Sequence, residues 1–345
     1  MKVLFLGLGG VGQRHLRNIR QLVPGVEVAA VRHSGRSFEI GPDMQADESV
    51  DIVEKYNIEI LPTLDDGIAW QPDFAVVASP TSAHVAQTTA LAQARIPVFL
   101  EKPVSSDTDG LEELMVATDE TGTSVMVGYM MRFHPGVQRL LELVESRAIG
   151  IFYSVQIQLS SFVPGWHPYE SCTEFYAGQR DLGGGAILSE IHEIDLLYKM
   201  FGMPQRLWCV GGQLSDHGMD VEDTASVLLE YEVDDAVLPI TINMSFVQRP
   251  IGRRIELWGA SGKITWDFMT GELRVHDGES GEEDCHVVPD FERNQMFLGE
   301  MKHFIDSLAA GQAPEASLED VIGGHLLALW IRDSLESGEA IELEG

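Results

Sequence analysis

Val3-Leu4-Phe5-Leu6-Gly7-Leu8-Gly9-Gly10-Val11-Gly12 is the stretch that decides the fold of this chain. Its apolar start predicts a short buried strand, and the apolar spacing after it, through Leu16 and Ile19, predicts a helix. The glycines between them fit the pattern G-x-G-x-x-G, which binds a dinucleotide in this strand–turn–helix context. Such glycines allow a tight turn, a close approach of a pyrophosphate and packing of the helix on the strand. The helix N-terminus adds free N–H groups for the phosphates. We therefore expect cofactor contacts from Gly7, Gly9, Gly10, Val11 and Gly12; the alternative is a turn with a purely structural role.

The length of 345 residues is enough for two domains with cores of their own. No apolar run is long enough to cross a membrane, so we expect no membrane partner. The N-terminus leads directly into the first strand, which predicts a cytoplasmic protein without a signal peptide. The three cysteines, Cys172, Cys209 and Cys285, lack metal-ligand spacing and are interpreted as idle thiols. No metal site is predicted.

The net charge of −31 argues against nucleic acid as a partner, because phosphate binding needs a basic surface. An acidic surface that aids solubility is the simplest explanation. One consequence is local: if the ligands are anionic, the few basic residues near the site act against an acidic background.

The first 127 residues alternate strand and helix, which predicts a parallel, doubly wound Rossmann sheet in a domain spanning residues 1–127. In such folds an Asp or Glu about 20 residues past the glycines holds the ribose 2′-OH of NAD. Arg32 stands at that position, and Ser34 and Arg36 follow. These side chains would bind a 2′-phosphate by charge-assisted hydrogen bonds, which favours NADP over NAD. The alternative is a solvated Arg32 and an unselective cofactor site.

Two further loops follow apolar strands and should lie beside the glycine turn. One loop follows the strand 74–78, and the other, Glu101-Lys102-Pro103, follows the strand 96–100. Ligands of open parallel sheets sit beyond the carboxyl ends of the strands. By position alone, Lys102 is either a rim charge or a reacting group. The cofactor contacts expected from these loops are Ser79, Pro80, Thr81, His84, Glu101 and Lys102.

From about residue 151 the pattern changes to long strands, which predicts an α+β domain over residues 128–345 with a mostly antiparallel, open sheet. Helices should cover one face, and the other face should form an oligomer interface. One long helix is expected over about residues 186–201. The acidic stretch 279–284 is expected to be a loop.

The helix expected at residues 186–201 carries the second candidate cluster. His192 is the natural proton acceptor, because its ordinary pKa is near neutrality. Ser189 and Asp195 lie three residues away on either side, and Asp195 would fix the orientation of the ring. The alternative is a histidine satisfied in a core. The loop Trp166-His167-Pro168-Tyr169 would face a sugar or simply pack.

These motifs together resemble the Gfo/Idh/MocA oxidoreductase family over nearly the whole chain. They are the glycine turn, Glu101-Lys102-Pro103, Gly128-Tyr129 with Arg132-Phe133-His134-Pro135, and Gly183-Gly184-Gly185 before His192 and Asp195. The opening, Gly7 to Arg20, is similar to a branch found among nucleotide-sugar and surface-polysaccharide enzymes.

The resemblance implies a nicotinamide cofactor, hydride transfer to or from a sugar or cyclitol carbon, and a homodimer or homotetramer built through the second sheet. The lysine of the Glu-Lys-Pro motif falls on Lys102, and the family histidine on His192; both are implied to be catalytic. Ser189 stands where the family usually has an aspartate, and a serine takes no proton near neutral pH. The candidate substrate contacts are Lys102, Arg132, Trp166, His167, Tyr169, Arg180, Ser189 and His192.

Two other functions remain open at this stage. One is a cofactor-binding regulatory or scaffold protein, which Ser189 in place of aspartate permits. The other is a glycosidase that uses a tightly bound nicotinamide cofactor for transient oxidation.

Overall fold

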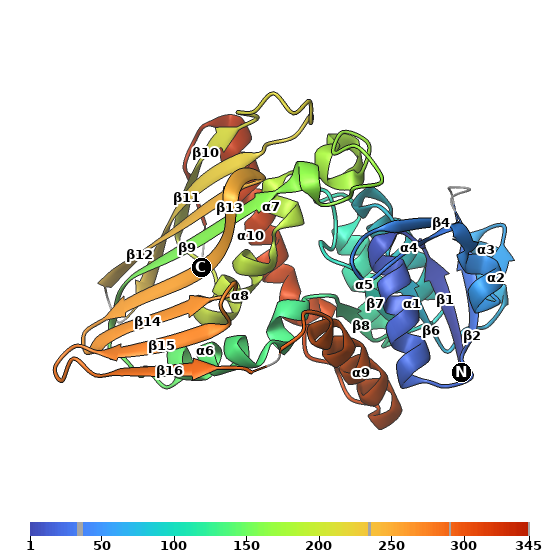
Figure 1. The fold of residues 1–345 in the computed structure, drawn as a ribbon, viewed down its shortest axis with the longest axis horizontal. Coiled ribbons are helices and arrows are strands. Elements are labelled where there is room, and N and C mark those ends of the chain that lie inside the picture. Colours follow the sequence, from blue (N-terminus) through green and yellow to red (C-terminus); the bar gives the residue numbers. More distant parts are fainter. Residues whose placement is uncertain (33–36, 234–235, 290, 344–345) are drawn as a thin grey trace.

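The computed structural model describes residues 1–32, 37–233, 236–289 and 291–343. The predicted residues Ser34 and Arg36 therefore lie outside the described part. Two lobes lie side by side, one built on each sheet (Figure 1). In the described part, no helix combines the length and the apolar character needed to cross a membrane.

The first lobe is built on a six-stranded, fully parallel sheet with the order β5-β2-β1-β6-β7-β8. Its strands are β1 (Lys2–Leu6), β2 (Glu27–Val31), β5 (Glu59–Leu61), β6 (Phe74–Val77), β7 (Val98–Leu100) and β8 (Val125–Val127). Its helices are α1 (Gly10–Leu22), α2 (Ile52–Tyr56), α3 (Leu64–Ala69), α4 (His84–Gln93) and α5 (Leu111–Thr121). The strand order reverses between β1 and β6, and ligands of such folds bind at this reversal. The predicted Rossmann sheet is confirmed.

A hairpin that the sequence did not predict extends this lobe after β2. It consists of β3 (Phe38–Ile40) and β4 (Ala46–Asp51), paired antiparallel. Figure 1 shows it beside the N-terminal half of α1. The strands are short and mostly half-exposed, so they lack the buried apolar run that marks a strand in a sequence.

The second lobe is built on a nine-stranded sheet with the order β16-β15-β14-β13-β9-β12-β11-β10-β17. Its strands are β9 (Phe152–Phe162), β10 (Arg206–Gly212), β11 (Thr224–Val233), β12 (Ala236–Ser245), β13 (Val247–Gly259), β14 (Gly262–Asp267), β15 (Glu272–Asp277), β16 (Glu283–Val287) and β17 (Ile341–Glu342). Only β9 and β12 pair in parallel among these described strands, so the predicted mostly antiparallel sheet is confirmed.

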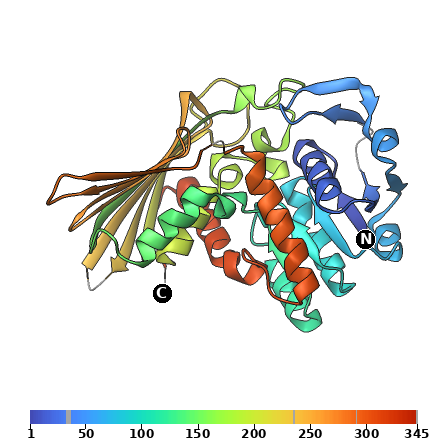
Figure 2. The ribbon, with the colours of Figure 1, turned by 60° about the horizontal axis from the view of Figure 1, so that its bottom comes forward.

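Helices cover one face of the second sheet, and no described helix covers the other (Figure 2). The α-helices of this half are α6 (Pro135–Glu145), α7 (Ala186–Ser189), α8 (His192–Phe201), α9 (Asn294–Ala310) and α10 (Leu318–Ser337). Single 3₁₀ turns occur at Thr81–Ala83, Met130–Phe133, Val163–Gly165, Tyr176–Gly178 and Arg180–Leu182. Helix α9 packs on the first lobe, where Met301 and Phe304 share a core with Val3 and Phe5 of β1. The boundary between residues 127 and 128 stays a prediction.

The helix predicted over residues 186–201 is broken, which corrects the sequence interpretation. It ends at Ser189, and α8 begins at His192. In a continuous helix the Ser189 carbonyl would accept from the N–H of Glu193. Here the Nζ of Lys102 donates to that carbonyl at 2.5 Å, and the Glu190 carboxylate binds Arg253. Contacts from other elements therefore hold the chain out of the helix at this point.

The acidic stretch 279–284 is also corrected. Glu283 and Asp284 belong to β16, which pairs with β15 along its whole length. Arg274 of β15 bonds to both Glu272 and Glu283 and so lowers the repulsion among these acids.

Candidate active site

A cleft of ≈ 1060 Å³ lies between the two lobes. Its walls are the carboxyl ends of β1, β6 and β7, the end of β9 with the loop after it, and the junction of α7 and α8. The cleft collects most of the residues predicted from the sequence: Gly7, Gly9, Gly10, Val11, Arg32, Ser79, Pro80, Thr81, His84, Glu101, Lys102, Trp166, His167, Tyr169, Ser189 and His192.

The glycine turn has the geometry that a dinucleotide requires. Gly7 has φ +100°, and a Cβ there would lie 2.5 Å from the Ala78 carbonyl oxygen. A Cβ on Gly12 would lie 2.5 Å from the Gly7 carbonyl oxygen, so this glycine lets α1 pack on the turn. A Cβ on Gly9 would meet nothing within 4 Å. The space above Gly9, at the N-terminus of α1, fits a pyrophosphate.

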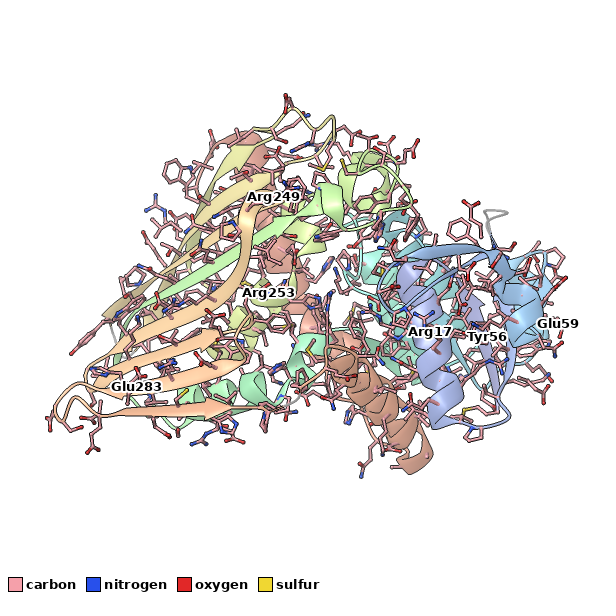
Figure 3. All side chains as sticks on the ribbon, in the orientation of Figure 1. Arg17, Tyr56, Glu59, Arg249, Arg253 and Glu283 are labelled. Atoms are coloured by element: carbon pink, nitrogen blue, oxygen red, sulfur yellow. The ribbon has the colours of Figure 1, made fainter. Side chains whose placement is uncertain are left out.

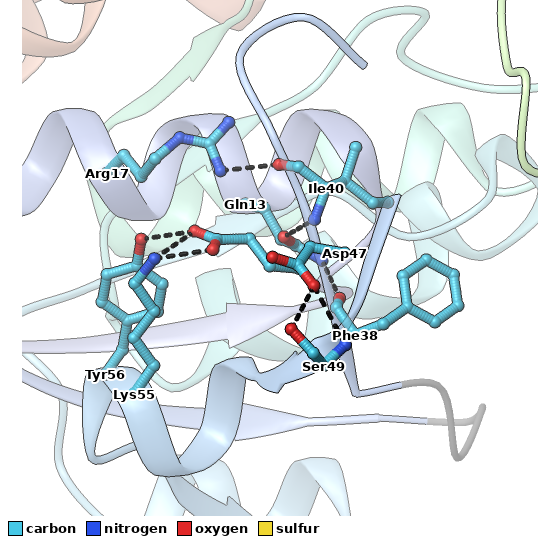
Figure 4. Close-up of polar contacts among 9 residues, drawn as sticks. Gln13, Arg17, Phe38, Ile40, Asp47, Ser49, Lys55 and Tyr56 are labelled. Atoms are coloured by element: carbon cyan, nitrogen blue, oxygen red, sulfur yellow. Dashed lines mark hydrogen bonds and ion pairs between the residues drawn. The ribbon is translucent and has the colours of Figure 1, made fainter. Parts of the chain in front are cut away.

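The β3–β4 hairpin is held against α1 by polar contacts (Figure 4), and it adds a wall to the cofactor side of the cleft. The side-chain amide of Gln13 donates to the Phe38 carbonyl at 3.1 Å and accepts from the Ile40 N–H at 2.7 Å. Arg17 donates to the Ile40 carbonyl at 2.9 Å. Phe38, Ile40 and Met44 line the cleft. No pattern in the sequence marks this wall, because it depends on the Gln13 side chain of α1 binding the backbone of the hairpin.

His84 and Lys102 connect the loops that follow β6 and β7. The two ring nitrogens of His84 lie 2.8 Å from the Pro103 carbonyl and 2.9 Å from the Ser79 carbonyl. His84 is buried, and burial lowers its pKa. Both partners are acceptors, so the neutral ring donates to one of the two carbonyls and makes only a close contact with the other. Lys102 reaches across the cleft to Ser189 and joins the two lobes.

His15, Glu101 and Glu300 form a buried acidic group beneath the cleft floor. His15 Nε2 lies 2.5 Å from a Glu101 oxygen, and the donor atoms of all three residues lie within 4.8 Å of one another. Burial raises the pKa of Glu101, but the hydrogen bond with His15 and the effects of nearby groups such as Lys102 together outweigh burial and hold this pKa below its usual value. Burial and the charge of Glu101 raise the pKa of Glu300 well above its usual value. Glu101 is therefore the ionised carboxylate of the group and Glu300 the protonated one, and the 2.5 Å contact of Glu101 with His15 is a charge-assisted hydrogen bond.

His192 begins α8 and borders the cleft. Its ring meets the Tyr129 ring edge-on at 5.9 Å, and its Nδ1 has no hydrogen-bond partner among the described residues. Burial lowers its pKa well below the usual value, and the positive charges of Lys102, Arg253 and Arg293 lower it further. The ring is therefore neutral near pH 7 and free to accept a proton.

Asp195 does not orient His192, which corrects the sequence interpretation. Its two carboxylate oxygens accept from Arg132 at 2.8 and 2.6 Å. Arg132 also binds Asp320 and is buried. This buried ion pair leaves Arg132 outside the residues that line the cleft.

Arg180 also lies outside the lining of the cleft. It is exposed and pairs with Glu336 of α10 at 2.5 Å. The sequence showed the charges of Arg132 and Arg180 but not the acids that pair with them, because Asp195, Asp320 and Glu336 come from distant positions in the chain.

The aromatic loop after β9 reaches over the cleft toward the glycine turn. The Trp166 indole donates to Ser161 at 2.8 Å, and the His167 ring stacks on Tyr169 at 5.2 Å. The Tyr169 ring meets Phe38 of the hairpin at 5.9 Å, and a Cβ on Gly10 would lie 3.5 Å from its hydroxyl. This contact between the lobes closes one side of the cleft.

Three charged residues of the second lobe that the sequence did not single out line the cleft: Glu190, Arg253 and Arg293. Figure 3 shows Arg253 on β13, near the middle of the molecule. It lies 2.5 Å from Glu190 and 2.7 Å from Glu193. Burial raises the pKa of Glu193 to about 7, against the opposing effect of Arg253. No local pattern marks these residues, since β13, α8 and the start of α9 meet only in the folded chain.

Comparison with known proteins points to one family. The model of an oxidoreductase family with an NAD-binding Rossmann fold, Gfo/Idh/MocA, matches residues 1–129, and the model of its C-terminal domain matches residues 137–265. The chain is 26% identical to myo-inositol 2-dehydrogenase of Thermotoga maritima, over 100% of this chain and 99% of that protein. It is 25% identical to 2,7-anhydro-N-acetylneuraminate hydratase of Mediterraneibacter gnavus, over 82% of this chain and 75% of that protein.

Solved structures share the fold over the full length. The WlbA dehydrogenase from Bordetella pertussis, in complex with NADH and UDP-GlcNAcA, superposes with a TM-score of 0.78 at 19% identity. The superposition covers 100% of this chain and 99% of that one.

Proposed function

We propose, from the premise that this chain belongs to the Gfo/Idh/MocA oxidoreductase family, that its cleft carries out hydride transfer at a CH–OH or keto carbon of a sugar-like substrate. The single observation that carries the proposal is that Lys102 reaches across the cleft to the Ser189 carbonyl, three residues before His192, and that Lys102 and His192 line the same cleft as the glycine turn. One residue comes from each lobe, so a substrate between the lobes would touch both.

The residues of the first lobe fit a nicotinamide dinucleotide. The glycine turn would take the pyrophosphate, Arg32 the adenosine ribose, and the loops after β6 and β7 the nicotinamide half. When bound, the cofactor accepts hydride from the substrate carbon or returns it. The side chains of this protein must then bind the substrate and move its proton.

His192 and Lys102 divide the proton chemistry between them. The neutral His192 ring takes the proton of the substrate hydroxyl as general base, or returns it in reduction. The Lys102 ammonium stabilises the negative charge that develops on the substrate oxygen. The Ser189 carbonyl holds that ammonium in place, so this position acts through its backbone and needs no carboxylate.

Replacement of either residue tests this assignment. We expect Lys102→Ala and His192→Ala each to lower kcat by about 10²- to 10⁴-fold, because each removes a group that acts in the transition state. The dissociation constant of the cofactor, measured by tryptophan fluorescence, should hold within about threefold. Lys199→Ala, on the outer part of α8, is the matched control. Full turnover in either test variant would remove the residue from the mechanism.

The preference for NADP is a separate proposal and rests on Arg32. No acidic side chain stands at this position at the end of β2, where NAD-specific folds hold the ribose hydroxyls. We expect Arg32→Asp to reverse the ratio of NADPH to NADH affinity, because a carboxylate repels a 2′-phosphate. Fluorescence titration of both cofactors measures this ratio. An unchanged ratio would leave Arg32 without a role in selection.

A second candidate reaction has one observation in its favour. One relative, aligned over 82% of this chain and 75% of its own length, is named a hydratase, and hydration involves no net oxidation. The same two residues would serve a reaction in which hydride leaves the substrate and returns to it. Turnover of substrate without accumulation of reduced cofactor would identify this case.

A further inference from the structure

Helix α10 connects the two lobes (Figure 1). Just before its N-terminus, the Ala316 carbonyl accepts from the Val127 N–H of β8 at 2.9 Å. Near its C-terminus, the Ser334 hydroxyl accepts from the Cys209 N–H of β10 at 3.0 Å. One helix is therefore bound to a strand of each sheet.

Helix α10 also packs closely on α8, the helix that begins at His192. A Cβ on Gly323 would lie 2.2 Å from the Tyr198 hydroxyl oxygen, and a Cβ on Gly324 would lie 3.2 Å from the Tyr198 Cβ. The backbone of α10 thus lies directly against a side chain of α8. The position of α8, and of His192 at its start, is therefore fixed relative to α10.

The next residue of α10, His325, contacts the loop that carries Lys102. Residues 101–107 are called the Lys102 loop here. His325 Nε2 lies 2.6 Å from the Ser105 hydroxyl, and both residues are buried. The Ser105 hydroxyl gives its one proton to the Asp107 carbonyl, so it accepts from the Nε2–H of His325. A side chain of α10 therefore holds the Lys102 loop by a directed hydrogen bond.

Arg332 supplies a second contact from the same helix. It stands seven residues, or about two turns, after His325, so the two side chains share one face of α10. Arg332 donates to the Ser106 carbonyl at 2.5 Å. On the other side of Lys102, the Glu101 carboxylate lies 2.5 Å from the His15 ring. The chain is therefore held both before and after Lys102.

Folding stability does not account for the histidine at position 325. The ring is fully buried, and its Nδ1 has no hydrogen-bond partner among the described residues. Burial, and then the positive charge of Arg332, lower the pKa of His325 to about 3, so the ring is neutral near pH 7. A leucine would fill this space without leaving a polar atom unpaired. The contact that a leucine would lose is the one with Ser105.

Resting on the proposed function, we propose that His325 is a positioning residue, which holds the Lys102 loop on α10 so that the Lys102 ammonium and His192 meet at one substrate oxygen. The Ser189 carbonyl holds one end of the Lys102 side chain, and the loop fixes the other end. Helix α10 is then the common support of two groups that come from different lobes. A displacement of about 1 Å at a reacting group lowers a rate by about 100-fold.

The first test needs no substrate. Trace acetylation with acetic anhydride, followed by mass spectrometry, gives the reaction rate of each lysine in the folded protein. We expect the rate of Lys102 to rise about fivefold or more in His325→Leu, because the freed loop lets the ammonium leave the Ser189 carbonyl. His325→Gln should restore a rate within about twofold of wild type, since its side-chain N–H donates to the same hydroxyl.

Two further variants make this test specific. Ser105→Ala removes the acceptor and leaves α10 intact, so it should raise the Lys102 rate as His325→Leu does. It gives the same measurement if His325→Leu does not fold. The double variant should exceed neither single variant, because both remove one hydrogen bond. His134→Leu is the matched control: it removes a buried histidine that binds the Gly136 N–H and does not line the cleft, and it should leave the Lys102 rate unchanged.

Turnover of a panel of neutral aldohexoses and cyclitols separates this inference from the proposed function. We expect His325→Leu to lower kcat by about 10- to 100-fold with KM within about threefold, because it displaces a group that acts in the transition state. His325→Gln should keep kcat within about threefold of wild type.

Three results would overturn the positioning role. They are an unchanged Lys102 rate in His325→Leu and Ser105→Ala, an equal rise at Lys199 of α8, which reports general loosening, and a raised Lys102 rate with full turnover. A wild type that turns over none of the panel would count against the proposed function. The acetylation rates would still decide whether His325 holds Lys102 in place.

Discussion

Glu300 lies on α9, fully buried, and neither carboxylate oxygen has a hydrogen-bond partner among the described residues. Its pKa in the folded protein is well above the usual value of 4.5, because burial and Glu101 both oppose ionisation. The folded state thus binds a proton that the unfolded state releases above pH 4.5. The stability that this proton contributes is complete below pH 4.5 and is lost as the pH rises through the folded pKa.

Glu300→Gln tests this reading, because glutamine has the shape of the neutral carboxyl and cannot ionise. Wild-type stability should fall by up to about 1.4 kcal/mol per pH unit between the unfolded and folded pKa of this group. The Tm of the variant relative to wild type should therefore increase from pH 5 to pH 9 in thermal unfolding. Glu292→Gln, at an exposed position just before α9, is the control and should show a flat difference. A flat difference for Glu300→Gln as well would mean that Glu300 is ionised in the fold.

At the level of single residues, the sequence identified the candidate site residues that belong to a local sequence motif. Lys102 and His192 were predicted from motifs, and both border the cleft. Arg132 was predicted to contact the substrate, and Asp195 was predicted to orient the His192 ring. In the structure these two residues instead form an ion pair with each other in the core. Burial and pairing depend on which distant segments meet, and a charged residue in a sequence does not reveal its partner.

In the strand–turn–helix element at the start of the chain, Gly9 and Gly12 have different roles. A Cβ on Gly12 would lie 2.5 Å from the Gly7 carbonyl oxygen, whereas a Cβ on Gly9 would stand in open space. Gly12 therefore serves the packing of α1 on the turn, and Gly9 serves the approach of a ligand.

Alanine substitutions at these two positions should differ in their effects. Gly9→Ala should keep the Tm within about 2 °C but weaken cofactor binding at least 10-fold, because the methyl group fills the pyrophosphate space. Gly12→Ala should lower both the Tm and the affinity, since α1 must move away from β1. Thermal unfolding and fluorescence titration give the two readouts. Unimpaired cofactor binding by Gly9→Ala would contradict the assignment of this space.

The elements that the sequence predicted well are those with a strong local signal. The buried strands of the first sheet and the long amphipathic helices followed from their apolar periodicity. The β3–β4 hairpin and the break between α7 and α8 did not, because both depend on contacts with other elements. The Gln13 side chain binds the backbone of the hairpin. Lys102 donates to the Ser189 carbonyl, which would accept a backbone hydrogen bond in a continuous helix.

At the scale of the molecule, the two-domain architecture was predictable from the change in pattern, but the substrate end of the cleft was not. Arg253 on β13, Arg293 at the start of α9 and His192 of α8 line one cleft only through the topology of the second lobe. The sequence did supply the reason to look for them, since it showed that anionic ligands would need local cations on an acidic chain.

The open face of the second sheet is where we expect subunits to associate. Trp208, Val210, Leu228 and Val237 are exposed on β10, β11 and β12, and Trp208 lies directly opposite Leu228 in the register. Two strongly acidic subunits repel each other, so an interface between them needs apolar contacts of this kind. Salt should strengthen the association because it screens the repulsion.

Leu228→Asp should dissociate the oligomer, because it places a charge directly opposite Trp208 on this face and adds to the repulsion between subunits. Light scattering after size exclusion should show a dimer or tetramer for wild type and a smaller species for the variant. Higher salt should shift both the wild type and the variant toward association, because it screens the net charge of −31 per chain. Val116→Asp, at an exposed apolar position on α5 of the other lobe, is the matched control and should behave as wild type. A monomeric wild type at every salt concentration, or an intact oligomer in Leu228→Asp, would show that this face is not the interface.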